Sequence, residues 1–326
     1  MKMRNRHRYL IGTVILLVAV VWVVFQAWFP VSQERGYQFV NVWGSPGGAP
    51  GQFHEPIGLA IAGDHVLVSD AGNNRIQVFD RNGRFLHQFG REGSGPGEVA
   101  RPMHIYVHNE KLYVAEYLND RIQMFTLDGE PVGVVGSPGS GPGQFDAPGG
   151  VAVALDGSLY VADFYNHRVQ FLSPSGELIW QIGTTGKKGI WTGLFNYPTD
   201  VALLPNGDVV VADAYNDRIQ VFSSKGAFVR KWGGPLATNI PGSANGWFKT
   251  ATGVAVGPEG NVFVADFYNH RIQKFTPEGE FLAAFGSQGE GPGQFERPTD
   301  VALDDEGNVF VVDFGNNRVQ EFEPIR

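Results

Sequence analysis

Short apolar runs, separated by turns rich in Gly, Asn and Asp, recur along most of the chain. In residues 262–275, VFVADFYNHRIQKF, two runs of β-branched and aromatic residues flank a polar turn that contains Asp266, Asn269 and Arg271. Short runs of this kind, bounded by turn residues, are typical of β-strands. The pattern therefore predicts a hairpin whose turn carries an acid, an amide and a guanidinium.

The same hairpin pattern occurs six times in the sequence. The acidic positions are Asp70, Glu116, Asp163, Asp213, Asp266 and Asp313, and the Arg positions are Arg75, Arg121, Arg168, Arg218, Arg271 and Arg318. Successive copies lie 46 to 53 residues apart. A period of this length with several short strands per repeat is typical of a β-propeller. We predict an all-β fold with six blades of four strands.

The two ends of the repeat array are incomplete in complementary ways. Residues 39–43 have the pattern of a fourth strand without the first three, and residues 319–322 form a third strand with only four residues after it. We therefore expect the N-terminal strand to complete the last blade, which removes the open sheet edges of the array. The predicted propeller covers residues 37–326.

A segment without charged residues precedes the repeats. Residues 10–29 contain no Asp, Glu, Lys or Arg, and the first eight residues contain four basic ones. Twenty apolar residues in a helix cross about 30 Å of hydrocarbon, and basic flanks stay in the cytoplasm. We predict a cytoplasmic basic tail (1–8), a single transmembrane helix (9–29), a linker (30–36) and a propeller outside the cytoplasm, on the periplasmic side in a Gram-negative cell. A cleaved signal peptide is the alternative, but its apolar core is shorter and no small-x-small site follows.

Composition excludes several classes of function. The net charge is −8, and because the first thirty residues hold four of the 25 basic residues and no acid, the rest of the chain carries −12. An acidic body repels phosphate backbones, so we expect no nucleic-acid partner. The absence of Cys excludes disulfides and thiolate metal sites. No serine-hydrolase elbow, zinc-protease helix motif or phosphate-binding P-loop is present.

The repeated segments resemble a known family. The V-x-D-x-x-N-x-R-[IV]-Q-x-F segments and the G-x-G-P-G-Q-F connectors, such as residues 139–145, are similar to those of NHL-repeat six-bladed propellers, over about residues 37–326. The resemblance implies the fold and no particular activity. Residues present in every blade are most simply structural: the Asp accepts turn N–H groups, the Asn adopts the left-handed conformation and the Arg reaches carbonyls or carboxylates.

One column of residues differs between odd and even repeats. Just before the first predicted strand, repeats two, four and six have His104, Asp200 and Asp300, and the others have Gly. The first strand of each blade lines the channel of a propeller, so these side chains are expected near its mouth, where they could hold a divalent cation such as Ca²⁺. In the alternative, both Asp cap local N–H groups and His104 binds water.

The resemblance bears on the same column. The peptide-amidating lyase of the NHL-repeat family holds zinc with three His at matching strand starts on alternate blades. The resemblance implies that His104 matches one of these ligands, while Asp200 and Asp300 stand in place of the other two. Oxygen ligands favour a harder cation than zinc.

Aromatic residues follow the turn acid in repeats two to five, and two connectors, residues 183–195 and 233–248, break the Gly-Pro-Gly pattern. From these features we predict a partner-binding face made of Tyr117, Tyr165, Tyr215, Tyr268, His167, His270, Trp191 and Trp247. Clustered exposed aromatic residues on a rigid scaffold fit a protein-binding or glycan-binding surface. Packing between blades is the alternative, and we expect it for the neighbouring Phe residues.

Together these patterns favour a membrane-anchored propeller that acts as a protein-binding or scaffolding module, for example as an accessory subunit of a membrane complex. The alternative is a metal-dependent lyase or hydrolase that uses His104, Asp200 and Asp300 at the channel mouth, with Tyr117 or Tyr165 as general acid or base.

Overall fold

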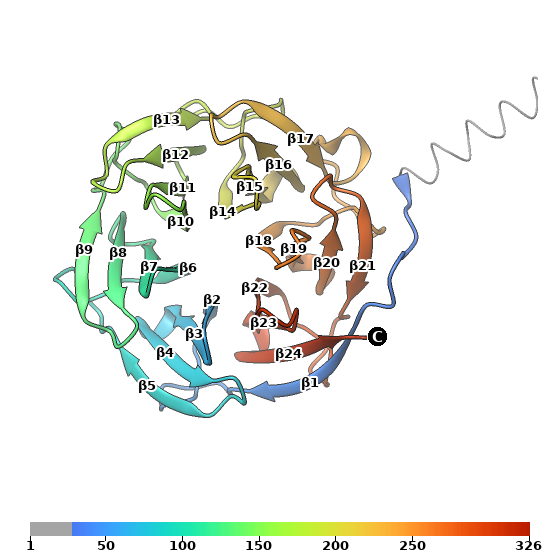
Figure 1. The fold of residues 1–326 in the computed structure, drawn as a ribbon, viewed down its shortest axis with the longest axis horizontal. Coiled ribbons are helices and arrows are strands. Elements are labelled where there is room, and N and C mark those ends of the chain that lie inside the picture. The colour runs from blue at the N-terminus through green and yellow to red at the C-terminus, as the bar shows by residue number, and fades with distance from the viewer. Residues whose placement is uncertain (1–27) are drawn as a thin grey trace, which may run out of the picture.

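The computed structural model describes residues 28–326, and these form a ring of six four-stranded antiparallel sheets (Figure 1). The predicted tail (1–8) and nearly all of the predicted transmembrane helix (9–29) lie outside the described residues. Within residues 28–326, no helix is long and apolar enough to cross a membrane.

Each blade runs outward from the channel, and its strands are joined by tight turns. Blade one contains β2 (Pro56–Ala62), β3 (His65–Asp70), β4 (Arg75–Asp80) and β5 (Phe85–Phe89). Blade two contains β6 (Pro102–His108), β7 (Lys111–Glu116), β8 (Arg121–Thr126) and β9 (Pro131–Val135). Blade three contains β10 (Pro148–Val153), β11 (Leu159–Asp163), β12 (Arg168–Leu172) and β13 (Leu178–Ile182).

The other three blades repeat the arrangement. Blade four contains β14 (Pro198–Leu203), β15 (Val209–Asp213), β16 (Arg218–Phe222) and β17 (Phe228–Trp232). Blade five contains β18 (Ala251–Val256), β19 (Val262–Asp266), β20 (Arg271–Phe275) and β21 (Phe281–Phe285). Blade six contains β22 (Pro298–Leu303), β23 (Val309–Asp313), β24 (Arg318–Pro324) and the N-terminal β1 (Tyr37–Trp43).

Strand β1 closes the ring, as predicted. It pairs antiparallel with β24, placing Tyr37 opposite Pro324 and Trp43 opposite Val319, with a bulge between Phe39 and Asn41. The last blade therefore takes three strands from the C-terminal end of the chain and one from the N-terminal end.

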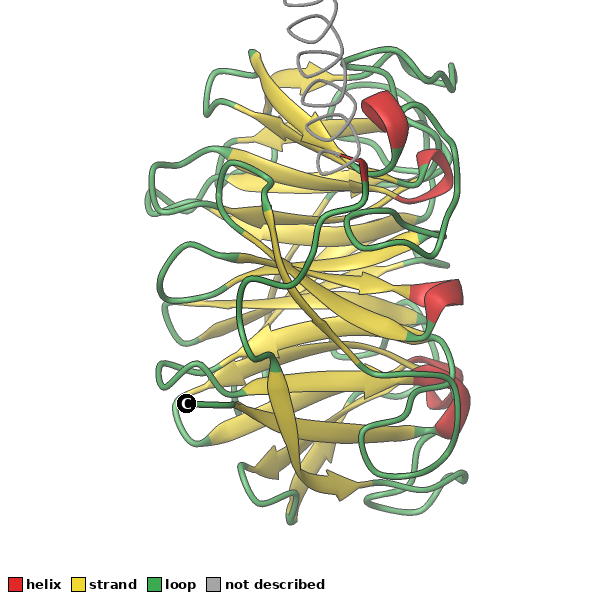
Figure 2. Ribbon diagram, turned by 90° about the vertical axis from the view of Figure 1, so that its right-hand side faces the viewer, coloured by secondary structure: helices red, strands yellow, loops and turns green. Residues whose placement is uncertain are grey.

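Short 3-10 helices lie on one face of the ring. They are η1 (Ala71–Asn73), η2 (Ala214–Asn216), η3 (Pro235–Ala237), η4 (Phe267–Asn269) and η5 (Phe314–Asn316). Figure 2 shows the helical turns along one edge of the side view. We call this side, which carries the acid-containing turns and the connectors between blades, the turn face. The opposite side, with the turns between the first two strands of each blade, is the hairpin face.

The hydrophobic core lies between blades rather than at the centre of the molecule. Each of the six buried clusters combines residues from two neighbouring blades. The last residue of each connector is fully buried there; these residues are Phe53, Val99, Phe145, Phe195, Phe248 and Phe295. Burying a side chain of this size stabilises the fold by about 1.5–3 kcal/mol, which explains why the connectors end on an apolar residue.

The repeated acid and Arg organise the turn face, as blade four shows. Asp213 is fully buried and accepts hydrogen bonds from the Asn196 backbone N–H (2.8 Å), Arg218 Nε (2.7 Å), Asn216 (2.9 Å) and Gln220 (3.1 Å). Burial raises the pKa of this carboxyl, and the Arg218 charge opposes the rise. The network ties a blade to the connector that leads into it.

The residue after the repeated Asn joins each blade to the next. This residue, and not the Asn itself as we expected, takes the left-handed conformation, with φ between 50° and 55°. The six residues are Asn74, Asp120, His167, Asp217, His270 and Asn317. Each side chain accepts a hydrogen bond of 2.7–3.2 Å from a backbone N–H of the following blade. We call these bonds the inter-blade clasps.

Candidate functional site

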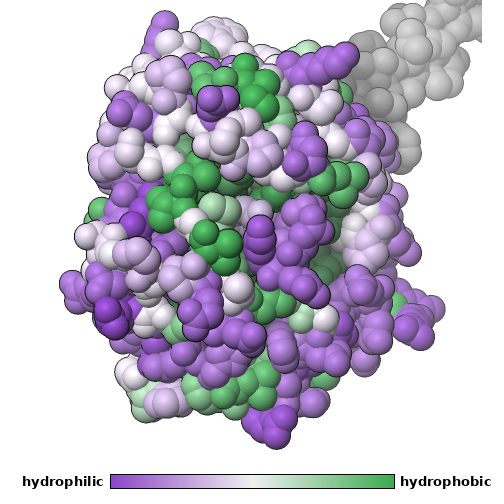
Figure 3. Space-filling view, turned by 60° about the vertical axis from the view of Figure 1, so that its left-hand side comes forward, coloured by the Kyte–Doolittle hydropathy of each residue, from purple (hydrophilic) through white to green (hydrophobic). Residues whose placement is uncertain are grey.

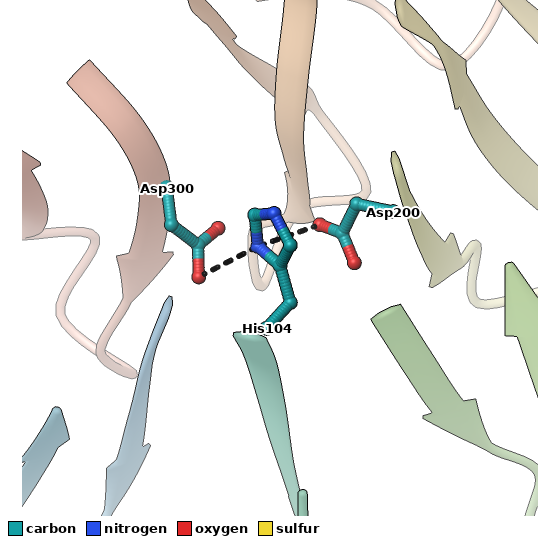
Figure 4. Close-up of side chains that lie close together, drawn as sticks. All are labelled: His104, Asp200 and Asp300. Atoms are coloured by element: carbon teal, nitrogen blue, oxygen red, sulfur yellow. Dashed lines mark ion pairs between the residues drawn. The ribbon is translucent and has the colours of Figure 1, made fainter. Parts of the chain in front are cut away.

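The structure brings His104, Asp200 and Asp300 together in the central channel. Each is the third residue of its strand, in β6, β14 and β22, so these residues lie inside the first strands rather than just before them as we expected. Because the three strands belong to alternate blades, the side chains converge from three directions. Figure 4 shows the imidazole of His104 between the two carboxylates.

The polar atoms of this trio are close and almost completely buried. His104 Nδ1 lies 3.3 Å from Asp300 Oδ2 and 3.6 Å from Asp200 Oδ2, and one ligand atom of each residue lies within 4.8 Å of the others. Each residue exposes 5% of its surface or less. Within residues 28–326, Nδ1 of His104 makes no hydrogen bond of regular geometry, although buried polar atoms normally make one; its contact with Asp300 Oδ2 is an ion pair when the ring is protonated.

Both carboxylates also cap backbone N–H groups. Asp200 Oδ2 accepts from Val254 N and Asp300 Oδ2 accepts from Leu59 N, each at 2.9 Å. The alternative that both Asp residues cap backbone N–H groups is therefore correct in part. The N–H groups capped by these two bonds belong to the next blade rather than to a local turn. Each carboxylate oxygen has a second lone pair that can still point at a cation.

Glycine fills the same column in the other blades because there is no space for a side chain. A Cβ atom on Gly58 would lie 2.6 Å from the carbonyl oxygen of Met103, and one on Gly253 would lie 2.5 Å from that of Thr299. The neighbouring inner strands approach each other at these points. The alternation of Gly with a polar residue therefore has a packing cause as well as a chemical consequence.

Electrostatics make the trio a site for positive charge. Burial lowers the pKa of His104, but the two carboxylates outweigh it and raise that pKa to about 9. Burial raises the pKa of Asp200 to about 7, with His104 opposing this rise and Asp300 adding to it. At neutral pH a proton on His104 therefore balances the carboxylates, and a divalent cation bound at Nδ1 would replace that proton.

The spacing of the three residues fits metal coordination. Ligands about 2.1 Å from a tetrahedral ion lie about 3.4 Å apart, close to the two separations measured from Nδ1. One imidazole and two carboxylates suit zinc as well as harder cations such as Ca²⁺ and Mn²⁺. The trio borders a cavity of about 200 Å³. Apolar residues further along the inner strands, including Ile61, Val107 and Leu303, line the rest of that cavity.

Aromatic side chains form a continuous cluster on the turn face of blades two to four. The Tyr117 hydroxyl donates to the Tyr165 hydroxyl at 2.8 Å. Ring centroids are 5.9 Å apart for Tyr117 and Tyr165, 5.8 Å for Tyr165 and Tyr197, and 5.0 Å for Tyr197 and Tyr215. Phe164, which we expected to be buried, is half-buried beneath this cluster. Sequence reasoning missed Tyr197; its only signal was an aromatic residue in a column that lacks one in the other repeats.

Four of the eight residues predicted for the binding face are exposed: Tyr165, Tyr215, Tyr268 and Trp191. Tyr117 is half-buried. Trp247 is also half-buried, because it stacks on Phe29 with a centroid distance of 5.6 Å and donates to the Trp28 carbonyl.

The two predicted histidines are structural. His167 is buried, and its Nδ1 accepts the inter-blade bond from Tyr197 N at 3.1 Å. His270 accepts the equivalent bond from Arg297 N at 3.2 Å. The Nδ1 acceptors of both side chains are therefore used within the ring, and contact of these two residues with a partner stays a prediction.

Comparisons with known proteins agree with this architecture. Residues 145–170, 195–222, 248–275 and 295–322 match the NHL repeat, and residues 53–115 match a family described as a 6-bladed beta-propeller. The chain therefore carries NHL repeats and is an all-β six-bladed propeller. A search of the curated proteins found no match.

Solved structures share the fold at low sequence identity. A protein of unknown function from Bacteroides thetaiotaomicron is 16% identical, with a TM-score of 0.67, over 88% of this chain and 76% of that one. Virginiamycin B lyase from Staphylococcus aureus is 16% identical, with a TM-score of 0.58, over 89% and 87%. A gluconolactonase from Xanthomonas campestris is 13% identical, with a TM-score of 0.61, over 91% and 98%. At these identities the likeness concerns the fold alone.

Proposed function

We propose that this protein is a membrane-anchored propeller that binds a protein partner outside the cytoplasm through its turn face and acts as a binding or scaffolding module. The observation that carries the proposal is the set of exposed aromatic side chains on that face, with Tyr215 52% and Tyr268 50% accessible. Large rigid side chains of this kind provide much of the binding energy at protein interfaces. The inter-blade clasps hold their backbones in place, so little ordering entropy opposes binding.

Hydrophobic residues elsewhere on the surface provide a comparison. Figure 3 brings the side of blades two and three forward and shows hydrophobic residues in separate patches among hydrophilic ones. The outer strands β9 and β13 on this side expose Val132, Val134 and Ile179. The exposed apolar residues of these strands are aliphatic, whereas Trp180 of β13 is half-buried, and we assign no partner to them.

Site-specific photocrosslinking in intact membranes tests the binding face. A photoreactive phenylalanine at Tyr165, Tyr215 or Tyr268 is expected to capture one discrete protein, because these side chains are exposed and need no rearrangement. The same residue at Val132 serves as the control. A result in which the Tyr positions capture nothing, or the same products as Val132, would contradict the proposal.

The anchor and its orientation are tested separately. Four basic residues precede the charge-free run, so a C-terminal alkaline phosphatase fusion should be active and a C-terminal cytoplasmic reporter inactive. The full chain should also stay in the membrane pellet after a carbonate wash. Release by carbonate would contradict the anchor without bearing on the turn face.

A second candidate function is that of a metal-dependent lyase or hydrolase, and the unpartnered Nδ1 of His104 favours it. His104, Asp200 and Asp300 would hold the cation, which when bound would polarise an oxygen of the substrate. Burial raises the pKa of the Tyr117 hydroxyl, and its bond to Tyr165 adds to the rise. Tyr117 therefore keeps its proton at neutral pH, which suits a general acid better than a base.

Elemental analysis of the purified full chain decides whether the site holds a metal. About one divalent ion per chain is expected, because the three ligands form one site. The double variant Asp200→Asn, Asp300→Asn should lose the ion, whereas Asp305→Asn, which removes an exposed carboxylate, should keep it. Equal metal content in the two variants, or none in the wild type, would remove the basis for the enzyme hypothesis.

A further inference from the structure

The two irregular connectors lie next to each other at blade four. The guanidinium of Arg218 is fully buried and donates to the carbonyls of Ile190, Trp191 (3.2 Å) and Leu194 (2.8 Å) in the first connector. It also donates to the carbonyl of Ala237 in the second, at 3.1 Å. One side chain therefore fixes both loops, so that residues exposed on them belong to one surface.

That surface exposes large apolar side chains from three segments. Trp191 is 71% and Leu236 76% exposed, and Ile190 and Ile240 are also exposed on the connectors. The start of the described chain adds Trp28, Phe29 and Val31. We call these seven residues the connector rim.

The first described residues are packed against the second connector rather than free. Phe29 stacks on Trp247, and Asn245 donates to the Pro30 carbonyl at 3.1 Å. Trp28, Val31 and Leu236 line one groove. In Figure 1 the start of the described chain lies beside the loop that follows β17.

The backbone at Leu236 has a strained conformation, and the side chain of this residue is exposed. Leu236 and Ala237 have φ values of 57° and 49°, in the left-handed region that bulky residues avoid. Such conformations cost about 1–3 kcal/mol each and are concentrated at functional sites. The bonds from Arg218 and Lys231 to the Ala237 carbonyl hold this backbone in place, and the conformation leaves the Leu236 side chain exposed.

The charges around the rim differ from those of the rest of the molecule. Residues 178–199 and 218–258 contain no Asp or Glu, although the chain beyond residue 30 carries −12. Lys187 and Lys188 are exposed on the first connector, and Lys231 donates to the Ala237 carbonyl of the second at 3.3 Å. Glu280, just before β21, is the acidic residue among those that line the groove. The connectors themselves combine Trp, Leu and Ile with flanking Lys and contain no acid, a composition that favours the headgroup region of an anionic bilayer.

We propose that the connector rim lies in the headgroup region of the membrane beside the anchor. This contact holds the propeller in one orientation, with the outer edge of blades four and five toward the bilayer. The inference rests on the anchor in the proposed function, because the charge-free run ends at Phe29, within the rim. Residues 30–36 are then not a free tether. Gln33 N donates to the Leu282 carbonyl at 2.8 Å, and Glu34 pairs with Lys274 at 2.6 Å, so the chain leaves the rim already docked on blade five.

The absence of Cys permits a direct test with single labelled cysteines. Leu236→Cys and Trp191→Cys in the full chain carry an environment-sensitive fluorophore. The matched control is Leu155→Cys, which is 96% exposed and lies between β10 and β11 on the hairpin face, opposite the connectors. The proteins are reconstituted in protein-free vesicles of phosphatidylcholine with about one third phosphatidylglycerol. We expect blue-shifted emission that spin-labelled lipid quenches at positions 236 and 191 but not at 155. Replacing Lys187 and Lys188 by Glu should reduce the shift.

The controls separate this inference from the anchor. Carbonate extraction of the same vesicles reports on the anchor alone, so full retention with identical emission at 236, 191 and 155 would overturn the rim proposal and leave the anchor standing. Extraction of the chain would overturn both. Emission that shifts in native membranes but not in lipid vesicles would assign the rim to a protein partner and overturn the lipid assignment. Equal melting temperatures of the labelled variants verify that each is folded.

Discussion

His167 lies at a point where the other blades have Asn, Asp or the second clasp histidine, and it makes the same inter-blade bond as they do. An imidazole accepts at Nδ1 only when that nitrogen carries no proton. Burial lowers the pKa of His167, and the charge of Lys188 lowers it further. The folded protein therefore prefers the neutral ring, and protonation should break one clasp.

This gives a pH-dependent stability that a single substitution should reduce. The folded-state pKa lies below the unfolded value of about 6.5, so the contribution of His167 is complete above that value and is lost as pH falls below it. His167→Asn keeps an acceptor that does not titrate, as Asn74 and Asn317 do. Its melting temperature should fall less than that of the wild type between about pH 7 and pH 5. His65→Asn, which is outside the clasps, should behave as the wild type, and an unchanged slope in His167→Asn would show that the clasp does not titrate.

The Asp213–Arg218 pair gives a second prediction for single residues. Both side chains are completely buried, and removing one member of a buried pair typically costs about 3–5 kcal/mol because the other charge is left without a partner. Arg218→Met should therefore lower the free energy of unfolding by an amount of this order. Arg91, whose side chain is 79% exposed beside Glu98, is the control, and Arg91→Met should melt close to the wild type. Denaturant unfolding of both variants provides the measurement.

Sequence patterns identified the acid and Arg of this network because the residue types repeat in every blade. The clasps were missed for the opposite reason: Asn, Asp and His all present an acceptor at the same distance from the backbone, so the role repeats although the residue does not. Spacing alone placed His104, Asp200 and Asp300 in one column. It did not show that Nδ1 of His104 would be left without a partner, since that depends on three blades meeting in space.

Strands were predicted well as elements and less well at their ends. The first strand of five blades begins with Pro, at residues 56, 102, 148, 198 and 298. Proline at the first position of a strand loses no ladder hydrogen bond, but in the sequence it indicates a turn. The metal column was for this reason placed before the strands rather than within them. The two irregular connectors were recognised in the sequence by their length. Their contact with each other could not be predicted from the sequence, because it depends on the bonds that Arg218 donates to both.

Ring closure by β1 leads to a prediction for whole elements. A chain that begins at Tyr37 keeps the pairing of β1 with β24. A chain that begins at Ser45 lacks β1, so the edge of β24 is open, and the residues of blades six and one that pack against Trp43 become exposed. Open edges promote aggregation. The shorter chain should aggregate or melt at a much lower temperature, and the chain from Tyr37 should remain soluble and folded. Equal melting curves for the two chains would mean that the ring does not need its fourth strand.

The molecule as a whole combines an acidic body with two connectors that contain no acid. The charge beyond residue 30 is −12, while the two acid-free stretches run from β13 of blade three to the connector before β14, and from β16 of blade four to β18 of blade five. This uneven distribution of negative charge would orient the propeller relative to an anionic membrane even before the connector rim contacts the lipid. The turn face, with Tyr165, Tyr215 and Tyr268, would then stand beside the membrane, where a membrane-bound partner could reach it.

The channel site connects the whole ring, and metal binding should therefore stabilise the entire molecule. His104, Asp200 and Asp300 are about a hundred residues apart in sequence and meet only when blades two, four and six are assembled, so a cation that binds them binds the folded state alone. A ligand at a hundredfold excess over its Kd then adds about 2.7 kcal/mol to the free energy of unfolding.

After treatment with a chelator, addition of Zn²⁺, Mn²⁺ or Ca²⁺ should raise the melting temperature, and the cation with the largest effect identifies the preferred metal. The Asp200→Asn, Asp300→Asn variant keeps oxygen acceptors for Val254 N and Leu59 N, so it should fold but show no metal-dependent shift. A shift of equal size in that variant would place the cation on the acidic surface instead, and no shift with any cation would leave the trio as a proton-bridged group of side chains that ties three blades across the channel.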